Sequence, residues 1–129
     1  MSEKIMCFHE ISNAPKAVGP YSPAVKVGNM YFLSGQVGLN PDTGKLAGED
    51  ITAQTNQALA NLKAVLVGLG LNFYNVAKTT IFLTDMGNFQ TVNGLYAGVF
   101  GEHKPARSTI QVSALPLGAI VEIEMIAVE

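Results

Sequence analysis

The sequence predicts an α+β fold, with one mixed β-sheet and two amphipathic helices packed on one of its faces. Two observations predict this fold. Short stretches near both ends of the chain alternate apolar with polar residues, which is typical of half-buried strands. Two longer central stretches, 51–69 and 85–100, repeat apolar residues at helical spacing. The resulting order, β-β-β-α-β-α-β-β, favours a layer of helices against a single sheet.

Three short strands are predicted before the first helix. They share an alternating pattern and are bounded by turn residues: 5–9, 24–27 and 30–34. The last two pair as a hairpin, because Gly28-Asn29 between them is a two-residue turn signal. Ser34-Gly35-Gln36 then closes the second of these strands, where the glycine permits close approach of another backbone or marks a bulge. Residues 13–23 and 40–48 are turn and loop regions, the first rich in proline and glycine.

The first helix is predicted over 51–69. Asp50 or Thr52 can cap its start, and Gly68 and Gly70 mark its end. Its apolar positions form one continuous stripe: Ile51, Ala58, Leu59, Leu62, Val65, Leu66 and Leu69. The helix therefore has one face that must be buried against the sheet.

A strand at 76–83 precedes the second helix. Alternation places Ala77, Ile81 and Leu83 on one face of this strand, and Val76, Lys78, Thr80 and Phe82 on the other. The helix then begins at Asp85 or Asn88 and ends near Phe100, with an inner stripe of Phe89, Val92, Tyr96, Val99 and Phe100. Gly94 and Gly98 each cost it about 1 kcal/mol relative to alanine, so it depends on tertiary packing.

Two strands are predicted within residues 105–128, with a turn at Leu115-Pro116 between or beside them. In the first, Arg107, Thr109, Gln111 and Ser113 share a face. In the second, Glu122 and Glu124 alternate with apolar residues, and such glutamates are costly unless they are solvated, paired or useful. Arg107 is the only arginine of the chain. The residues alone leave two interpretations open: an anion-binding site, or a structural ion pair.

Composition bounds the type of protein. A chain of 129 residues fits one domain, 1–129, that buries about two-thirds of its unfolded surface. Apolar residues make up 48% and charged residues 14%, with a mean hydropathy of +0.26. This is unusually apolar for a small soluble monomer. The sheet face away from the helices would also expose isoleucine, valine and phenylalanine, so a subunit interface is expected there.

Several classes of site and location are disfavoured. No apolar run approaches the ~20 residues of a membrane helix, and the first ten residues lack a signal-peptide pattern, so a cytoplasmic protein is expected. Cys7 is the single cysteine, which excludes an internal disulfide, and we expect it to be a buried free thiol. His9 and His103 lie in no ligand-spaced cluster, so no metal is expected. A net charge of −2 without a basic cluster disfavours a nucleic-acid partner.

Six stretches of the chain resemble those of a known protein family. They occur in the same order as in the family and together span nearly the whole chain. They are GPYSPAVKVGN (19–29), FLSGQVGLNPDTG (32–44), QTNQALANLKAVL (54–66), VAKTTIFLTDM (76–86), VNGLYAGVF (92–100) and PARSTIQVSALPLGAIVEIEMIAV (105–128). With these stretches the sequence resembles the Rid (YjgF-type) imine deaminases. The last stretch is the family signature, whereas the glycine turns alone would be a weak signal.

The resemblance implies a chorismate-mutase-like homotrimer, whose sheets meet in a central barrel-like core with clefts between subunits. It also implies an activity: hydrolysis of reactive 2-imino acids, which arise from enamines released by pyridoxal-phosphate enzymes such as threonine dehydratase. The products are a 2-oxo acid and ammonia. No cofactor or metal is required, because an imine with a protonated nitrogen is already electrophilic at carbon.

The resemblance also assigns roles by matching positions. Arg107 would clamp the substrate carboxylate, and Glu122 would hold or activate the water. The remaining matched residues would shape the pocket: Tyr21, Ser34, Gly35, Asn93 and Thr109. A fork-shaped guanidinium suits a planar carboxylate, which agrees with the anion-binding interpretation. Two positions depart from the family. Thr109 stands where many members have cysteine, so a thiol mechanism is excluded, and Leu117 replaces a frequent lysine.

Two further functions stay open. One is a non-catalytic regulatory protein whose Arg107 cleft binds a small carboxylic metabolite. The other is a ribonuclease or translation inhibitor, an activity attributed to some relatives. The acidic balance and the single arginine count against the second, because a phosphate backbone usually attracts several basic side chains. The preferred imino acid is not fixed by the sequence.

Overall fold

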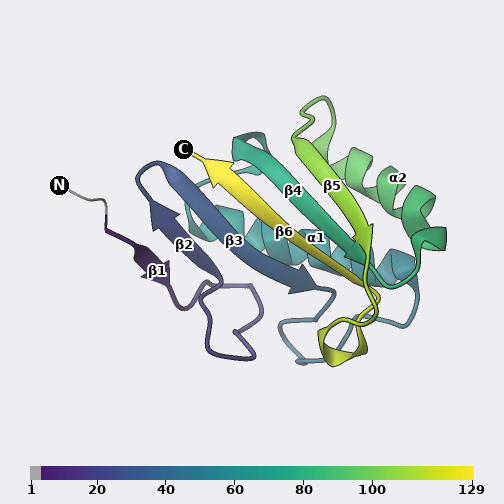
Figure 1. Cartoon of the computed structure of the whole chain (residues 1–129). Coiled ribbons are helices and arrows are strands. Elements are labelled where there is room, and N and C mark those ends of the chain that lie inside the picture. The colour runs from purple at the N-terminus through teal and green to yellow at the C-terminus, as the bar shows by residue number, and fades with distance from the viewer. Residues whose placement is uncertain (1–3) are drawn as a thin grey trace.

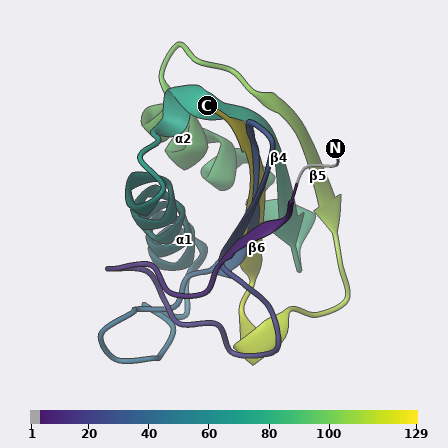
Figure 2. The ribbon, with the colours of Figure 1, turned by 90° about the vertical axis from the view of Figure 1, so that its left-hand side faces the viewer.

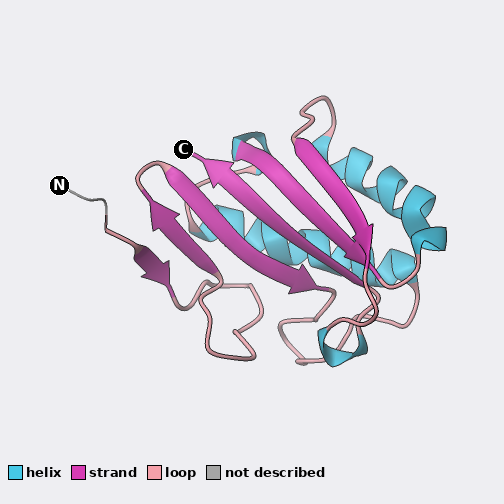
Figure 3. Ribbon diagram, viewed as in Figure 1, coloured by secondary structure: helices cyan, strands magenta, loops and turns pink. Residues whose placement is uncertain are grey.

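The alternating stretches form one sheet and the two helical stretches form a layer on it, as a computed structural model describing residues 4–129 shows (Figures 1 and 3). The elements are β1 (Met6–Phe8), β2 (Ala24–Val27), β3 (Met30–Val37), α1 (Ile51–Gly68), β4 (Val76–Leu83), α2 (Phe89–Phe100), β5 (Ala106–Gln111) and β6 (Val121–Val128). Figure 2 shows α1 and α2 on the same side of the sheet. The predicted α+β class and element order are confirmed.

The sheet has the strand order β1-β2-β3-β6-β4-β5. All neighbouring strands are antiparallel except β4 and β5, which are parallel. The connection through α2 returns the chain to the edge of the sheet where β4 begins, so β5 runs in the same direction as β4. The strands of the 105–128 stretch are therefore not neighbours, since β4 lies between them. Arg107 therefore does not stand on a strand beside the one with the glutamates.

The helix-facing side of the sheet forms the main core. Its residues from β3, β4 and β6 are almost inaccessible to solvent: Tyr31, Leu33, Ile81, Leu83, Val121, Ile123, Met125 and Ala127. The predicted apolar stripes pack on them, with Leu62 and Val65 of α1 and Val92 and Phe100 of α2 fully or almost fully buried. Of the two candidate caps, Asp50 begins α1, since its Oδ1 accepts from the Ala53 amide at 2.7 Å.

Two irregularities change which residues share a face. The pairing of β4 with β6 shifts between Val76 and Lys78, so Val76 is buried and Ala77 is exposed. The predicted faces of Val76 and Ala77 are therefore wrong, because a bulge resets the alternation. A second shift, between Leu33 and Gln36, lies at Gly35. There β3 continues to Val37 instead of ending near Ser34.

The other face of the sheet has no helix on it and is partly apolar. Met30, Phe32 and Ile110 are each more than one-third exposed there, and Phe82 and Ile126 are partly exposed. Cys7 is exposed as well, so the expectation of a buried thiol is wrong for the single chain. Its pairing with Val25 explains this, because both side chains point to the uncovered face of the β1–β2 ladder.

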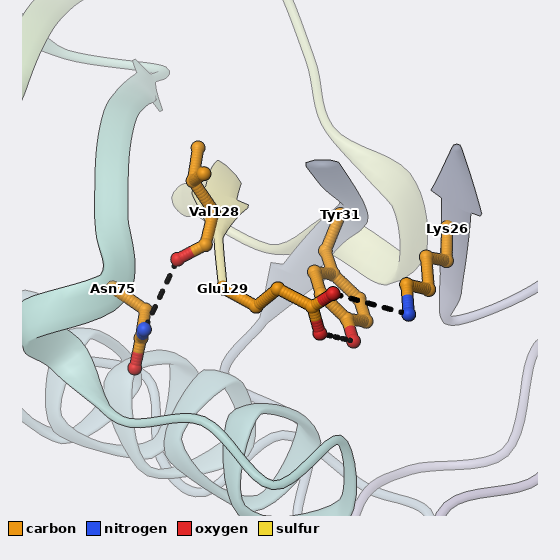
Figure 4. Close-up of polar contacts among 5 residues, drawn as sticks. All are labelled: Lys26, Tyr31, Asn75, Val128 and Glu129. Atoms are coloured by element: carbon orange, nitrogen blue, oxygen red, sulfur yellow. Dashed lines mark hydrogen bonds and ion pairs between the residues drawn. The ribbon is translucent and has the colours of Figure 1, made fainter. Parts of the chain in front are cut away.

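The end of β6 is fixed by side chains from three other segments (Figure 4). Glu129 accepts from the Tyr31 hydroxyl at 3.0 Å and lies 3.4 Å from the Lys26 ammonium. Asn75 donates to the Val128 carbonyl at 3.0 Å. An exposed ion pair contributes little by itself. Together the contacts fix the register of β6, and with it the position of Glu122.

Candidate functional site

Four of the residues assigned by resemblance line one cleft at the uncovered side of the sheet. Tyr21, Ser34, Gly35 and Glu122 enclose a volume of about 350 Å³, which we call the Glu122 cleft. The loop before β2 supplies Tyr21, and the bulged part of β3 supplies Ser34 and Gly35. Tyr21 and Ser34 are far from Glu122 in the sequence, and pairing of β3 with β6 brings the segments together.

Glu122 occupies the space that a side chain at position 35 would take. A Cβ on Gly35 would stand 2.8 Å from Glu122 Cδ, so a side chain at position 35 would force the carboxyl group to move from this position. Burial raises the pKa of the Glu122 carboxyl above its usual value, and the neighbouring Glu124 carboxylate raises it further. A carboxylate with a raised pKa is a stronger base, which suits it to accept a proton near neutral pH.

The two hydroxyl groups of this cleft are oriented by the backbone. Ser34 donates through Oγ to the Ser22 carbonyl at 2.7 Å, and the Ser34 amide donates to the Pro23 carbonyl at 2.9 Å. The Tyr21 hydroxyl accepts from the Val18 amide at 3.3 Å. The loop 18–23 is therefore attached to β3 at the cleft, and its hydroxyls keep lone pairs for a ligand.

Two other assigned residues line a second cleft, on the helix side of the sheet. Arg107 from β5 and Asn93 from α2 border a volume of about 320 Å³, which we call the Arg107 cleft. The Arg107 guanidinium lies over two aromatic rings of α2, with its carbon 5.0 Å from the Tyr96 ring centre and 5.6 Å from the Phe89 ring centre. Such cation–π contacts orient the guanidinium plane while leaving its N–H donors available.

Tyr96 is held in place by a hydrogen bond to the core strand β4. Its hydroxyl lies 2.8 Å from Thr79 Oγ1, and Thr79 is completely buried. Desolvation raises the pKa of the Tyr96 phenol, while the Thr79 hydrogen bond and the Arg107 charge lower it in part. The phenol therefore stays neutral, and it connects the core strand β4 to the arginine.

Thr109 stands two residues after Arg107 on the same face of β5. Its Oγ1 is buried and has no hydrogen-bond partner among residues 4–129. It lines neither of the two clefts as the single chain presents them. A buried hydroxyl without a partner is costly, so an additional partner is expected at this position.

The two clefts face opposite sides of the sheet. Arg107 pairs with Thr79 of β4, and Glu122 pairs with Phe82 of the same strand. Residues three apart in a strand point to opposite faces, and Thr79 is buried under α2 while Phe82 is on the uncovered face. The open interpretation of Arg107 and Glu122 as an ion pair within one chain is therefore wrong. Among residues 4–129, only Lys26 and Glu129 form a salt bridge.

Buried amide side chains that the sequence analysis did not single out hold the walls of the Glu122 cleft. Gln54 donates to the Gly48 carbonyl and accepts from the Ile120 amide, both at 2.9 Å. Asn61 donates to the carbonyls of Val37 and Leu39. The signal was present in the sequence, because Gln54 and Asn61 fall within the apolar stripe of the first helix, where polar residues need buried partners.

A metal site and a membrane-spanning helix are both absent from the part of the chain that the structure describes. Within residues 4–129 no group of three histidine, cysteine, aspartate or glutamate side chains is placed to hold a metal ion. No helix of that part is both long enough and apolar enough to cross a membrane. The expected absence of a cofactor stays a prediction.

Comparisons with known proteins identify the relatives of this chain. The family model described as Endoribonuclease L-PSP matches residues 11–129. A mouse protein named 2-iminobutanoate/2-iminopropanoate deaminase is 46% identical over all 129 residues, covering 100% of this chain and 96% of the mouse protein. The solved structure of YyfA from Yersinia pestis, described as a member of the conserved Rid family, has a TM-score of 0.93 at 47% identity, covering 98% and 100% of the two chains.

A third relative is a structure with a bound ligand. The structure of TdcF from E. coli with bound serine has a TM-score of 0.90 at 40% identity, covering 96% of this chain and 99% of TdcF. The resemblance found in the sequence is confirmed, and the chain belongs to the Endoribonuclease L-PSP family, the YjgF/Rid family.

Proposed function

We propose that this protein hydrolyses 2-imino acids, such as 2-iminobutanoate and 2-iminopropanoate, to 2-oxo acids and ammonia. The names of relatives that match the whole chain support this activity. One observation of the structure carries the proposal. The chain presents an oriented guanidinium, Arg107, in one cleft and a carboxylate with a raised pKa, Glu122, in another.

Glu122 is the group that would accept a proton from water. In the first step the water oxygen bonds to the imine carbon while Glu122 takes one water proton, which gives a tetrahedral carbinolamine. In the second step Glu122 passes that proton to the nitrogen, the C–N bond breaks with its electron pair going to nitrogen, and ammonia leaves. The oxygen forms the C=O bond as the C–N bond breaks, and its hydroxyl proton passes to Glu122, which releases it to solvent. One imino acid and one water thus give one 2-oxo acid and one ammonia.

Arg107 is the group that would bind the substrate carboxylate. Its guanidinium presents two parallel N–H donors to two carboxylate oxygens, and the rings of Phe89 and Tyr96 fix its plane before the substrate arrives. Asn93 lines the same cleft, and the Thr109 hydroxyl needs a partner nearby. These groups together suit a small anion with further polar atoms.

A complete site needs two chains, because Arg107 and Glu122 face opposite sides of the sheet. We infer a homotrimer in which the Arg107 cleft of one chain meets the Glu122 cleft of the next. The partly exposed Phe32, Met30 and Ile110 on the uncovered face support such an assembly, because an apolar surface of this kind is stabilised by burial against a second copy. Sedimentation is expected to give three times the chain mass of 13.7 kDa.

Subunit mixing tests the shared site. Arg107→Ala and Glu122→Gln are each expected to lose imine hydrolysis while staying folded. When the two variants are unfolded together and refolded in equal amounts, about one quarter of the clefts combine an intact Arg107 with an intact Glu122. Activity is therefore expected to return to about one quarter of the wild-type value. No return of activity from folded, mixed assemblies would contradict a site shared between chains.

Release of 2-oxo acid separates this function from the two alternatives. A carboxylate-binding regulator would bind 2-oxo acids without speeding imine hydrolysis, and a nuclease would cleave RNA in the same preparation. Arg107→Lys serves as the matched control, because it keeps the charge and loses the fork. It is expected to lose most of the activity, whereas a general requirement for positive charge would preserve it.

The cytoplasmic location stays a prediction.

A further inference from the structure

We propose that Leu117 selects the substrate side chain, and that the favoured substrates are 2-imino acids with apolar side chains of several carbons. This inference rests on the proposed function. Leu117 lines the Glu122 cleft, yet 55% of its surface is exposed. An apolar side chain that is exposed at the edge of a polar reaction centre is available for contact with a ligand.

The backbone holds Leu117 out from the protein. Its φ and ψ angles are 62° and 18°, in the left-handed region that leucine rarely adopts. The residues two positions away on each side are packed inward: Leu115 packs on a small apolar cluster, and Ala119 is buried in that cluster. The Leu117 side chain therefore stays outside the apolar cluster that its neighbours join. A non-glycine residue held at positive φ is strained, and such strain is typical of functional positions.

The surroundings of Leu117 are apolar at the mouth of the cleft. Val18 and Tyr21 line the same cleft and are 60% and 45% exposed, and Pro116 adds a rigid apolar surface. The charged groups of the lining are Lys16, Glu122 and Glu124, so carboxylates outnumber the ammonium and disfavour an acidic side chain. An aliphatic substrate side chain would therefore find apolar contacts at the mouth, whereas an acidic one would meet a lining with an excess of negative charge.

The chemistry of the site orients the substrate toward this mouth. With the imine carbon at Glu122 and the carboxylate at Arg107 of a neighbouring chain, the side chain is the one group of the substrate left to contact other walls. A single carbon, as in 2-iminopropanoate, is too short to make much contact. A four-carbon branched chain, as in the imine of leucine, can cover Leu117 and gain from burial.

Substitution of Leu117 by asparagine and by glycine tests this inference. Both residues accept a positive φ, so both variants are expected to fold and to melt no lower than the wild type. Imines of leucine, alanine and aspartate are generated in situ with an amino-acid oxidase, and their hydrolysis is followed. The ratio of kcat/KM for the leucine imine to that for the alanine imine is expected to fall about tenfold in both variants.

The control is Val67→Asn, which removes an equally exposed aliphatic side chain from α1, outside the Glu122 cleft. It is expected to leave the ratio unchanged. If the wild type hydrolyses no imine, the proposed function fails. If the wild type is active but the ratio is unchanged in both Leu117 variants, or both substrates lose activity equally, the selectivity role of Leu117 is overturned and the proposed function stands.

Discussion

The contact between Tyr96 and Thr79 allows a quantitative test of how Arg107 is held. Tyr96→Phe removes the hydroxyl that lies 2.8 Å from Thr79 Oγ1, and the threonine hydroxyl has no access to solvent. A buried polar group that loses its partner costs about 1–3 kcal/mol. For a domain of this size each kcal/mol corresponds to about 4 °C, so the melting temperature is expected to fall by about 4–12 °C.

A double-mutant cycle separates this contact from other effects. Thr79→Val keeps the shape of the side chain and removes its hydroxyl, so the pair Tyr96→Phe and Thr79→Val leaves no buried orphan at position 79. The double variant is expected to be more stable than the sum of the two single losses predicts, by about 1 kcal/mol. Additive losses in thermal or urea unfolding would show that the two hydroxyls do not stabilise each other.

Catalysis adds a second readout to the same position. Phenylalanine keeps the ring beneath the guanidinium, so Tyr96→Phe is expected to retain imine hydrolysis. Tyr96→Leu removes the ring, and loss of a cation–π contact of about 0.5–2 kcal/mol would weaken binding of a 2-oxo acid about 2- to 30-fold. Equal losses in both variants would refute the idea that the ring orients Arg107.

Three other changes have distinct expected results. Gly35→Ala would place a Cβ against the Glu122 carboxyl and displace it, so activity is expected to fall about 100-fold with little loss of stability, whereas Gly98→Ala in α2 should raise the melting temperature and leave activity unchanged. Because folding raises the pKa of Glu122, its ionised form is disfavoured in the native state as pH rises through that pKa. Glu122→Gln removes this cost, so it is expected to raise the melting temperature at pH 7, where the carboxyl group is ionised, but not at pH 4, where it is protonated. Both proteins carry Arg107→Ala, so that the arginine of a neighbouring chain does not contribute to the difference. Cys7→Ser is expected to leave hydrolysis intact, and loss of activity in a folded variant would implicate the thiol.

Local patterns in the sequence were sufficient for the elements and for most of the core. The alternation in β6 correctly placed Glu122 opposite Val121 and Ile123, because each residue of a regular strand reverses direction. It failed at the start of β4, where the bulge after Val76 breaks the alternation. A bulge depends on the partner strand, so the sequence of β4 alone does not reveal it.

Non-local pairing was the main thing that the sequence could not supply. The alternation in β5 showed that Arg107 and Thr109 share a face, but not which layer that face contacts. That depends on the crossover through α2, which makes β5 parallel to β4 and turns Arg107 toward Tyr96. The aromatic stripe of α2 was identified as core, and its second role as a support for the guanidinium appears only in three dimensions.

The opposite orientation of the two clefts links assembly to chemistry. Within one chain Arg107 and Glu122 cannot both contact one small substrate, because the sheet lies between them. An isolated chain would also expose Phe32 and Ile110 to water. If the apolar face buries itself against neighbouring copies, the same association that removes this surface from water also completes the clefts. A lone subunit is then expected to be inactive, and activity is expected to fall with dilution at the concentration where the assembly dissociates.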